Sequence, residues 1–278
     1  FGGDHTIYMM RGDPLNGGQI DLISDAIGMA WATAWCKDPY GNLYFFSNKC
    51  GIYRFIPGQS APIRISQAIE SLVQEVNTGT HIISMIWNDR FQGVELFITK
   101  SSTTAATTHY FWEARTNAWW PGAFANNDHN PVTVCAFDGN DPNDRRLLIG
   151  SWDGYVRVLD PAATTDDGTN ITSYVWIGPI LTLEQDAMLL KEMQAVLALG
   201  SGDITYSVYV GETAEQALAS TATVTGTWSA SRNNVSPVRR RGHAIYIKLS
   251  STSQWALETI RAKFGPRGKV ARRSKVGT

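Results

Sequence analysis

Cysteine is scarce in this sequence, and its spacing argues against both a disulfide framework and a zinc site. The three cysteines, Cys36, Cys50 and Cys135, cannot all pair with one another, and no two of them stand in a CxxC spacing. The five histidines are scattered, without an HExxH or a His-x-His pair. We therefore expect buried free thiols, no bound metal and no cofactor.

Long apolar runs are also absent. No stretch of about 18 consecutive apolar residues occurs, so we expect no membrane span. The chain opens at Phe1 without the basic, apolar and small-residue regions of a secretory signal. We interpret it as a processed chain or as a fragment of a longer one.

Signatures of catalysis are missing as well. There is no Ser/His/Asp ordering, no phosphate-binding Gly loop and no repeated Asp box of the sialidase kind. A propeller glycosidase needs two carboxylates about 5 to 9.5 Å apart. The candidates near predicted strand ends are Asp4, Asp89, Asp138 and Asp153. All four also suit turns, where an Asp side chain bonds its own backbone, so we expect a protein that is not an enzyme.

The sequence does contain a succession of short strand patterns. Aromatic and β-branched residues recur between Gly, Asn, Asp and Pro, and few stretches hold a helical period. The turns near Asn48, Asp89 and Asp138 follow one another at about the 40 to 50 residues of a propeller blade. The sequence predicts an all-β fold in which residues 1–165 form propeller-like blades, with one short helix near 65–76. These blades are too few to close a propeller, which needs at least about four.

A segment rich in Pro, Ala, Thr and Gly, 160–170, divides the chain. Beyond it, strand patterns alternate, most clearly where Ile245, Ile247 and Leu249 alternate with Tyr246 and Lys248. We predict a small β-sandwich platform domain over 166–265. The basic tail over 266–278 is expected to be flexible.

The net charge of −1 conceals a strong asymmetry. From Arg232 onward, 12 Lys and Arg stand against the single acid Glu258, a balance of +11, whereas the preceding residues hold 12 basic and 24 acidic side chains, a balance of −12. This division indicates that the basic end meets a polyanion or an acidic neighbouring subunit. We predict a basic contact surface, for protein or DNA, formed by Arg239, Arg240, Arg241, Lys248, Arg261, Lys263, Arg272 and Arg273.

Tryptophans gather in the strand patterns predicted over 108–113 and 118–120. Trp112, Trp119 and Trp120 can be interpreted as a stacking platform for sugars or bases. Aromatic residues at alternating strand positions more often belong to a core or to a subunit interface. Core and interface are favoured here, and the platform stays as the alternative.

Several stretches spread over most of the chain share the residue order of a known family. They are 3–14 (GDHTIYMMRGDP), 38–45 (DPYGNLYF), 51–53 (GIY), 239–251 (RRRGHAIYIKLSS) and 255–260 (WALETI). In this order they resemble the tail nozzle, or tail tube, proteins of short-tailed bacteriophages and related prophage tail proteins. In that family the chain forms a β-propeller with an attached β-sandwich platform, and six copies build the nozzle through which DNA leaves.

The resemblance implies a virion structural protein without catalytic activity. It implies a homo-hexameric ring in the virion tail, assembled in the cytoplasm of the host bacterium. The expected partners are tail adaptor or portal-associated proteins, with transient contact to passing double-stranded DNA. The alternative is a carbohydrate- or receptor-binding β-propeller module that uses the three tryptophans, and a propeller glycosidase is less favoured.

Overall fold

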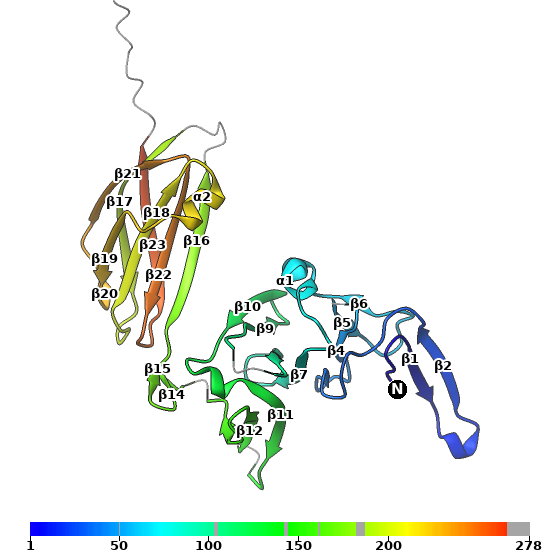
Figure 1. Cartoon of the computed structure of the whole chain (residues 1–278). Coiled ribbons are helices and arrows are strands. Elements are labelled where there is room, and N and C mark those ends of the chain that lie inside the picture. Colours follow the sequence, from blue (N-terminus) through cyan, green and yellow to red (C-terminus); the bar gives the residue numbers. More distant parts are fainter. Residues whose placement is uncertain (50, 103–104, 142–143, 161, 182–186, 266–278) are drawn as a thin grey trace, which may run out of the picture. The chain divides into compact units, whose positions relative to one another are not determined.

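The computed structural model shows two compact units, Phe1–Ala163 and Thr164–Thr278 (Figure 1). It describes residues 1–49, 51–102, 105–141, 144–160, 162–181 and 187–265. Antiparallel strands dominate both units. The all-β fold class predicted from the sequence is therefore confirmed.

The first unit is a series of antiparallel sheets made by consecutive strands. An N-terminal hairpin contains β1 (Ile7–Arg11) and β2 (Gln19–Ser24). Blade 1 contains β3 (Trp35–Lys37), β4 (Leu43–Ser47), β5 (Gly51–Phe55) and β6 (Ile63–Arg64). Blade 2 contains β7 (His81–Asn88), β8 (Gly93–Lys100), β9 (His109–Glu113) and β10 (Ala118–Gly122). Blade 3 contains β11 (Pro131–Asp138), β12 (Arg145–Ser151) and β13 (Val156–Val158).

These four sheets stack in sequence order, with a cluster of buried apolar side chains between each neighbouring pair. Blades 1 and 2 are therefore covered on both faces, whereas the hairpin and blade 3 form the two ends of the stack. The described residues form no closed ring of blades, in line with the prediction of an incomplete propeller. Representative buried residues are Ile7, Phe45 and Phe55 under the hairpin, Phe46, Met85 and Leu96 between blades 1 and 2, and Ile86, Phe97 and Ile149 between blades 2 and 3.

Burial on both faces explains the sequence of the central strands. β4 reads LYFFS and β7 reads HIISMIWN, so apolar residues occupy odd and even positions alike. A strand buried on both faces requires this pattern. Tyr44 stacks on Trp87 towards blade 2, while its neighbour Phe45 stacks on Tyr53 towards the hairpin. Adjacent residues of one strand thus belong to two different cores.

The helix predicted near 65–76 is shorter in the structure. The helical elements of this unit are η1 (Pro14–Asn16), η2 (Gln67–Ile69), α1 (Glu70–Gln74) and η3 (Asn127–His129). Ile65 is excluded from the helix because its N–H donates to the carbonyl oxygen of Ile52 and prolongs the sheet. Val73 is buried as the apolar stripe requires, but Leu72 is 46% exposed. No helix in the described part of the chain has the length and apolarity needed to span a membrane.

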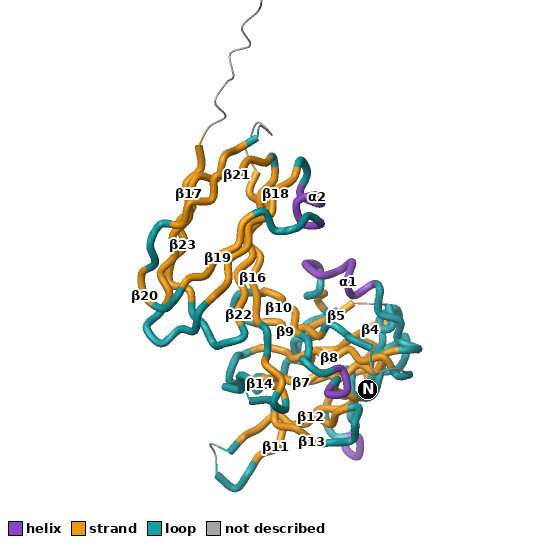
Figure 2. Tube along the Cα trace, turned by 60° about the vertical axis from the view of Figure 1, so that its left-hand side comes forward, coloured by secondary structure: helices purple, strands orange, loops and turns teal. Residues whose placement is uncertain are grey.

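The second unit is a β-sandwich that follows a small hairpin of β14 (Thr165–Asp166) and β15 (Thr169–Asn170). The front sheet has the order β16 (Ser173–Leu181), β22 (Ala244–Ser251), β18 (Ile204–Gly211) and β19 (Val224–Trp228). In the back sheet, β17 (Met188–Leu197) pairs on one side with β23 (Leu257–Gly265) and on the other with β20 (Ser231–Arg232) and β21 (Ser236–Gly242). A short helix, α2 (Ala214–Ala219), lies beside β18 (Figure 2).

The sandwich core contains one face of each sheet. On β22, Ile245, Ile247 and Leu249 are buried, and Tyr246 and Lys248 face outward, as the alternation predicts. The back sheet contributes buried residues from β17 and β21 to the same cluster. They are Met188, Leu190, Met193, Ala195, Leu197 and Val238.

Strand β21 and helix α2 of the sandwich were not predicted from the sequence. The strand β21 reads SPVRRRG, and its single buried apolar residue, Val238, produces no alternation. Helix α2 does carry a local signal, since the Thr213 side chain accepts a hydrogen bond from the Gln216 N–H in a Thr-x-x-Gln sequence. Ala217 of this helix packs on Gly211, where an added Cβ would lie 2.4 Å from the Ala217 nitrogen.

Candidate interaction surfaces

The cations of β23 lie on the outer face of the back sheet. Ile260 and Ala262 pack against the core. Arg261 and Lys263 alternate with them along the strand and therefore point outward. Lys263 Nζ lies 3.1 Å from Glu192 Oε1. This part of the predicted basic contact surface is therefore partly neutralised by its own sheet.

Lys248 belongs to the opposite side of the sandwich. It lies on the outer face of the front sheet, with its Nζ 4.9 Å from the ring centroid of Tyr174 and 5.3 Å from that of Trp176. The outer faces of two packed sheets point away from each other, so Lys248 cannot share one contact surface with the cations of β23. The prediction of a single basic surface was wrong in this respect. Arg272 and Arg273 lie outside the described residues.

The arginine run lies in strand β21, and its three residues have different environments. Arg239 has a φ of 51°, in the left-handed region, where the pairing of β21 with β17 shifts register. Such a shift is a β-bulge, which redirects neighbouring side chains. Arg240 is paired with the buried Leu190, and its guanidinium donates to the carbonyl oxygen of Thr223 at 3.3 and 3.4 Å. Arg241 is exposed.

The three tryptophans do not form one platform. Trp112 is 2% exposed in the core between blades 1 and 2, and its Nε1 donates to Asn117 Oδ1 at 3.0 Å. Trp119 packs against the same core, and its Nε1 donates to the carbonyl oxygen of Ile65 at 3.1 Å. Trp120 is 54% exposed on the other face of β10. Only one of the three rings is thus open to a ligand, because neighbouring residues of a strand face opposite ways.

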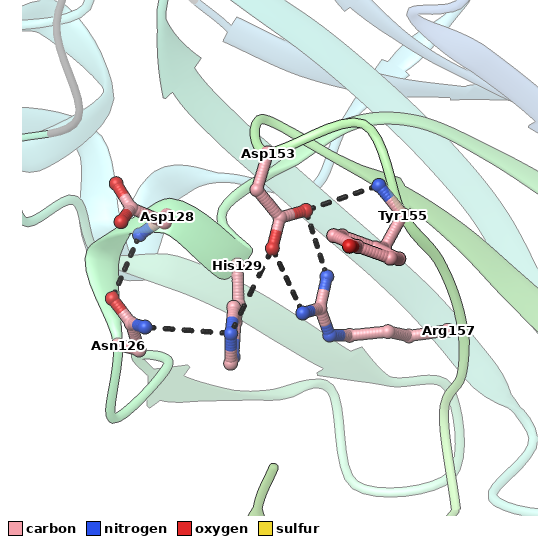
Figure 3. Close-up of polar contacts among 6 residues, drawn as sticks. All are labelled: Asn126, Asp128, His129, Asp153, Tyr155 and Arg157. Carbon is pink, nitrogen blue, oxygen red and sulfur yellow. Dashed lines mark hydrogen bonds and ion pairs between the residues drawn. The ribbon is translucent and has the colours of Figure 1, made fainter.

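A polar cluster joins η3 to the turn after β12 (Figure 3). Both oxygens of Asp153 accept hydrogen bonds from Arg157, at 2.9 and 2.8 Å, and one also accepts the Tyr155 N–H at 3.1 Å. The buried His129 places its Nε2 3.9 Å from the same carboxylate. The hydrogen bonds from Arg157 are the largest cause that lowers the pKa of Asp153. A carboxyl held ionised in this way is a poor general acid.

The carboxylates of Asp89 and Asp138 are joined by an arginine. Arg145 lies with its Nε 2.5 Å from Asp89 Oδ2 and with its Nη1 3.1 Å from Asp138 Oδ1. Both carboxylates are therefore engaged by the same guanidinium within the protein. Among the residues that the structure describes, no three His, Cys, Asp or Glu side chains gather in a metal-binding cluster.

The hairpin end of the blade stack carries an uncovered apolar face, which we call the hairpin face. It consists of the cross-strand pairs Tyr8 with Leu22 and Met10 with Ile20. These side chains are 39 to 62% exposed, whereas Ile7 on the opposite face is buried against blade 1. The signal in the sequence is that β1 is apolar at both odd and even positions, the pattern of a strand covered on both sides.

The other end of the stack has a similar face, which we call the blade 3 face. Cys135 of β11 pairs with Leu148 of β12, which pairs in turn with Val158 of β13. Phe137 is 49% exposed, Val156 70% and Val158 46%. Monomeric proteins rarely expose large contiguous apolar patches, and such patches commonly mark protein contacts.

Comparison with known proteins supplies no relative from which a function can be transferred. No family model and no curated protein matches the sequence. Function must therefore be inferred from the surfaces. The two ends of the stack each expose several large apolar side chains on one sheet face.

Proposed function

We propose that this protein is a structural subunit of the tail nozzle of a short-tailed bacteriophage, and that copies of it join into a ring through the ends of the blade stack. The observation that carries the proposal is that each end of the stack exposes an apolar sheet face. The hairpin face of one subunit covers the blade 3 face of the next. The resemblance over 3–14, 38–45 and 239–251 supports the same assignment.

The contact continues the packing that already exists inside the unit. Each internal pair of sheets is joined by apolar residues on both sides, and the two end faces have the same chemistry. Arg146, beside the blade 3 face, is neutralised by Asp144 at 2.7 Å, whereas the ion pair of Arg11 with Asp21 at 2.7 Å lies on the opposite face of the hairpin. Because the two faces differ, the contact is heterologous, and repeating it closes a ring when the rotation per subunit is right.

The ring acts by assembly and passage, without making or breaking bonds. It forms the exit channel for double-stranded DNA in the virion tail, with six subunits as the resemblance implies. Residues 1–163 carry 11 Lys and Arg against 16 Asp and Glu, a net charge of −5. A wall of this charge lets phosphates pass without tight binding. The sandwich contacts the adaptor or portal-associated proteins, and assembly takes place in the host cytoplasm.

The experiment is native mass spectrometry with negative-stain imaging of the purified chain and of two end variants. We expect a closed ring with a central channel for the natural sequence. Ile20→Lys damages the hairpin face and Val156→Lys the blade 3 face, so each variant alone should be monomeric. An equimolar mixture of the two should form dimers and nothing larger, because one intact face of each kind remains.

The matched control is Leu199→Lys, which alters an 88% exposed leucine of the sandwich and should leave the ring intact. A monomeric natural chain would refute the proposal. Rings that persist in both end variants would also refute it, as would a symmetric dimer in which each variant pairs with itself.

A further inference from the structure

The outer face of the front sheet holds an aromatic surface that the proposed ring contact does not use. Trp176 of β16 lies with its ring centroid 4.8 Å from that of Tyr209 on β18 and 6.1 Å from that of Tyr246 on β22. These strands are neighbours in the order β16, β22, β18, so the rings extend across three strands. Tyr174, 55% exposed, prolongs the surface along β16. We call these four residues with Lys248 the front-sheet platform.

Lys248 gives this surface an unneutralised positive charge. Its ammonium lies over the rings of Tyr174 and Trp176, at 4.9 and 5.3 Å, a cation–π arrangement that fixes its position. Lys248 is the only charged residue in the four described strands of the front sheet. Within the part of the chain that the structure describes, no carboxylate lies within 4.0 Å of its Nζ. A ligand with a negative group therefore has one defined place on this face.

Hydroxyl groups border the aromatic rings on the same face. Ser207 of β18 is paired with Lys248 of β22 on one side and with Thr225 of β19 on the other. Thr205 of β18 is paired in the same way with Ser250 and Thr227. Their neighbours Ile204 and Val208 are buried in the core, so these short side chains point outward with the platform. Each hydroxyl both donates and accepts hydrogen bonds.

We propose that the front-sheet platform binds a saccharide chain that carries acidic groups. The aromatic rings pack against the apolar faces of the sugar rings, the hydroxyls bond the sugar hydroxyls, and Lys248 binds a carboxylate or phosphate substituent. The rings extend across three strands, which suits several consecutive sugars better than one small molecule.

Charge density distinguishes this ligand from a nucleic acid. Proteins that bind single strands combine stacked aromatic rings with a groove of several cations, because each nucleotide carries a phosphate. The front-sheet platform offers several rings and hydroxyls but one cation. A sparsely charged saccharide matches this ratio.

The experiment is isothermal titration of the full chain with hyaluronan and with gellan, two polysaccharides whose carboxylates are separated by uncharged sugars, and with neutral dextran as the uncharged probe. We expect saturable binding of at least one acidic polymer and none of dextran. Lys248→Gln should weaken that binding at least about tenfold, since a charge-assisted hydrogen bond is lost, and should reduce its dependence on salt. Tyr174→Ala, at the most exposed ring, should weaken it as well.

Two control variants keep this result apart from general effects. Lys263→Gln removes a cation from the back sheet, and Trp120→Ala removes an exposed ring from the first unit, so neither should change binding. Unchanged melting temperatures would exclude unfolding of the platform variants. Ile20→Lys should bind the saccharide normally, and Lys248→Gln should still form rings, so this inference and the proposed function can fail separately.

Three outcomes would overturn the inference. One is that neither acidic polymer binds. Another is that Lys248→Gln binds as tightly as the natural chain. The last is that single-stranded oligothymidylate binds more tightly than both polysaccharides, which would assign the platform to nucleic acid.

Discussion

Acidification should destabilise the first unit through His109, a buried side chain at the contact between blades 2 and 3. Its Nδ1 accepts the N–H of Ile98 at 3.1 Å, so its proton is on Nε2, which donates to Asn130 Oδ1 at 3.0 Å. The rings of Phe97 and Phe124 approach it edge-on, with centroids 5.5 and 5.4 Å away. A second proton, on Nδ1, would point an N–H donor at the N–H of Ile98. Since both groups are donors, neither would have an acceptor.

The size of the effect follows from the pKa of His109 in the two states. Burial lowers this pKa from 6.5 to about 4 in the folded chain, although the hydrogen bond to Asn130 acts in the opposite direction. Between these values the unfolded chain binds one more proton, so stability falls as the pH falls. The loss is about 1.4 kcal/mol per pH unit, or about 3 kcal/mol by pH 4. Above about pH 7 the histidine is neutral in both states and the loss is absent.

The assay is urea unfolding, followed by tryptophan fluorescence, at several pH values between 7 and 4. His109→Gln keeps a donor and an acceptor but cannot titrate. The free energy of unfolding of this variant should therefore change less steeply with pH than that of the natural chain, and the difference in slope should correspond to about one bound proton. His5→Gln removes an exposed histidine and should behave like the natural chain. The reasoning is refuted if His109→Gln shows the same pH dependence, or if NMR finds that His109 titrates near its ordinary value.

Three further predictions concern packing, thiol reactivity and a turn. Phe46→Ala should lower the free energy of unfolding by about 3 to 5 kcal/mol, because the side chain is fully buried. Tyr155→Ala, at a 69% exposed side chain, should change the free energy of unfolding by less than about 0.5 kcal/mol. Equal losses of the two variants in urea unfolding would contradict this prediction. In the monomeric Ile20→Lys variant, whose blade 3 face is uncovered, iodoacetamide at pH 8 should label the exposed Cys135 but label Cys36 only after unfolding, because burial raises the pKa of the Cys36 thiol; peptide mass mapping decides. Asp153→Ala should lower the free energy of unfolding by about 0.5 to 1.5 kcal/mol, because the Arg157 guanidinium and the Tyr155 N–H lose their acceptor, and an unchanged urea midpoint would argue against that role.

The strands of blades 1 and 2 could be predicted from the sequence because their signals are local. The alternation of β22 and the turn residues around blade 2 depend on neighbouring residues only. The apolar runs of β4 and β7 indicate burial on both faces before any partner is known. Strand β21 could not be predicted in this way, because SPVRRRG is held by pairing with β17, which is distant in the sequence.

The sequence by itself determined that the fold is all-β, with apolar residues at the positions that strands bury. Only the tertiary structure decided which of these residues are covered. Phe45 and Tyr8 are both aromatic strand residues, yet Phe45 is fully buried and Tyr8 is 39% exposed, because a sheet lies over one and not over the other. The same holds for Lys248 and Lys263, which the sheet packing places on opposite sides of the sandwich. A strand pattern fixes the side to which a residue points relative to its neighbours, and the partner sheets determine what it meets there.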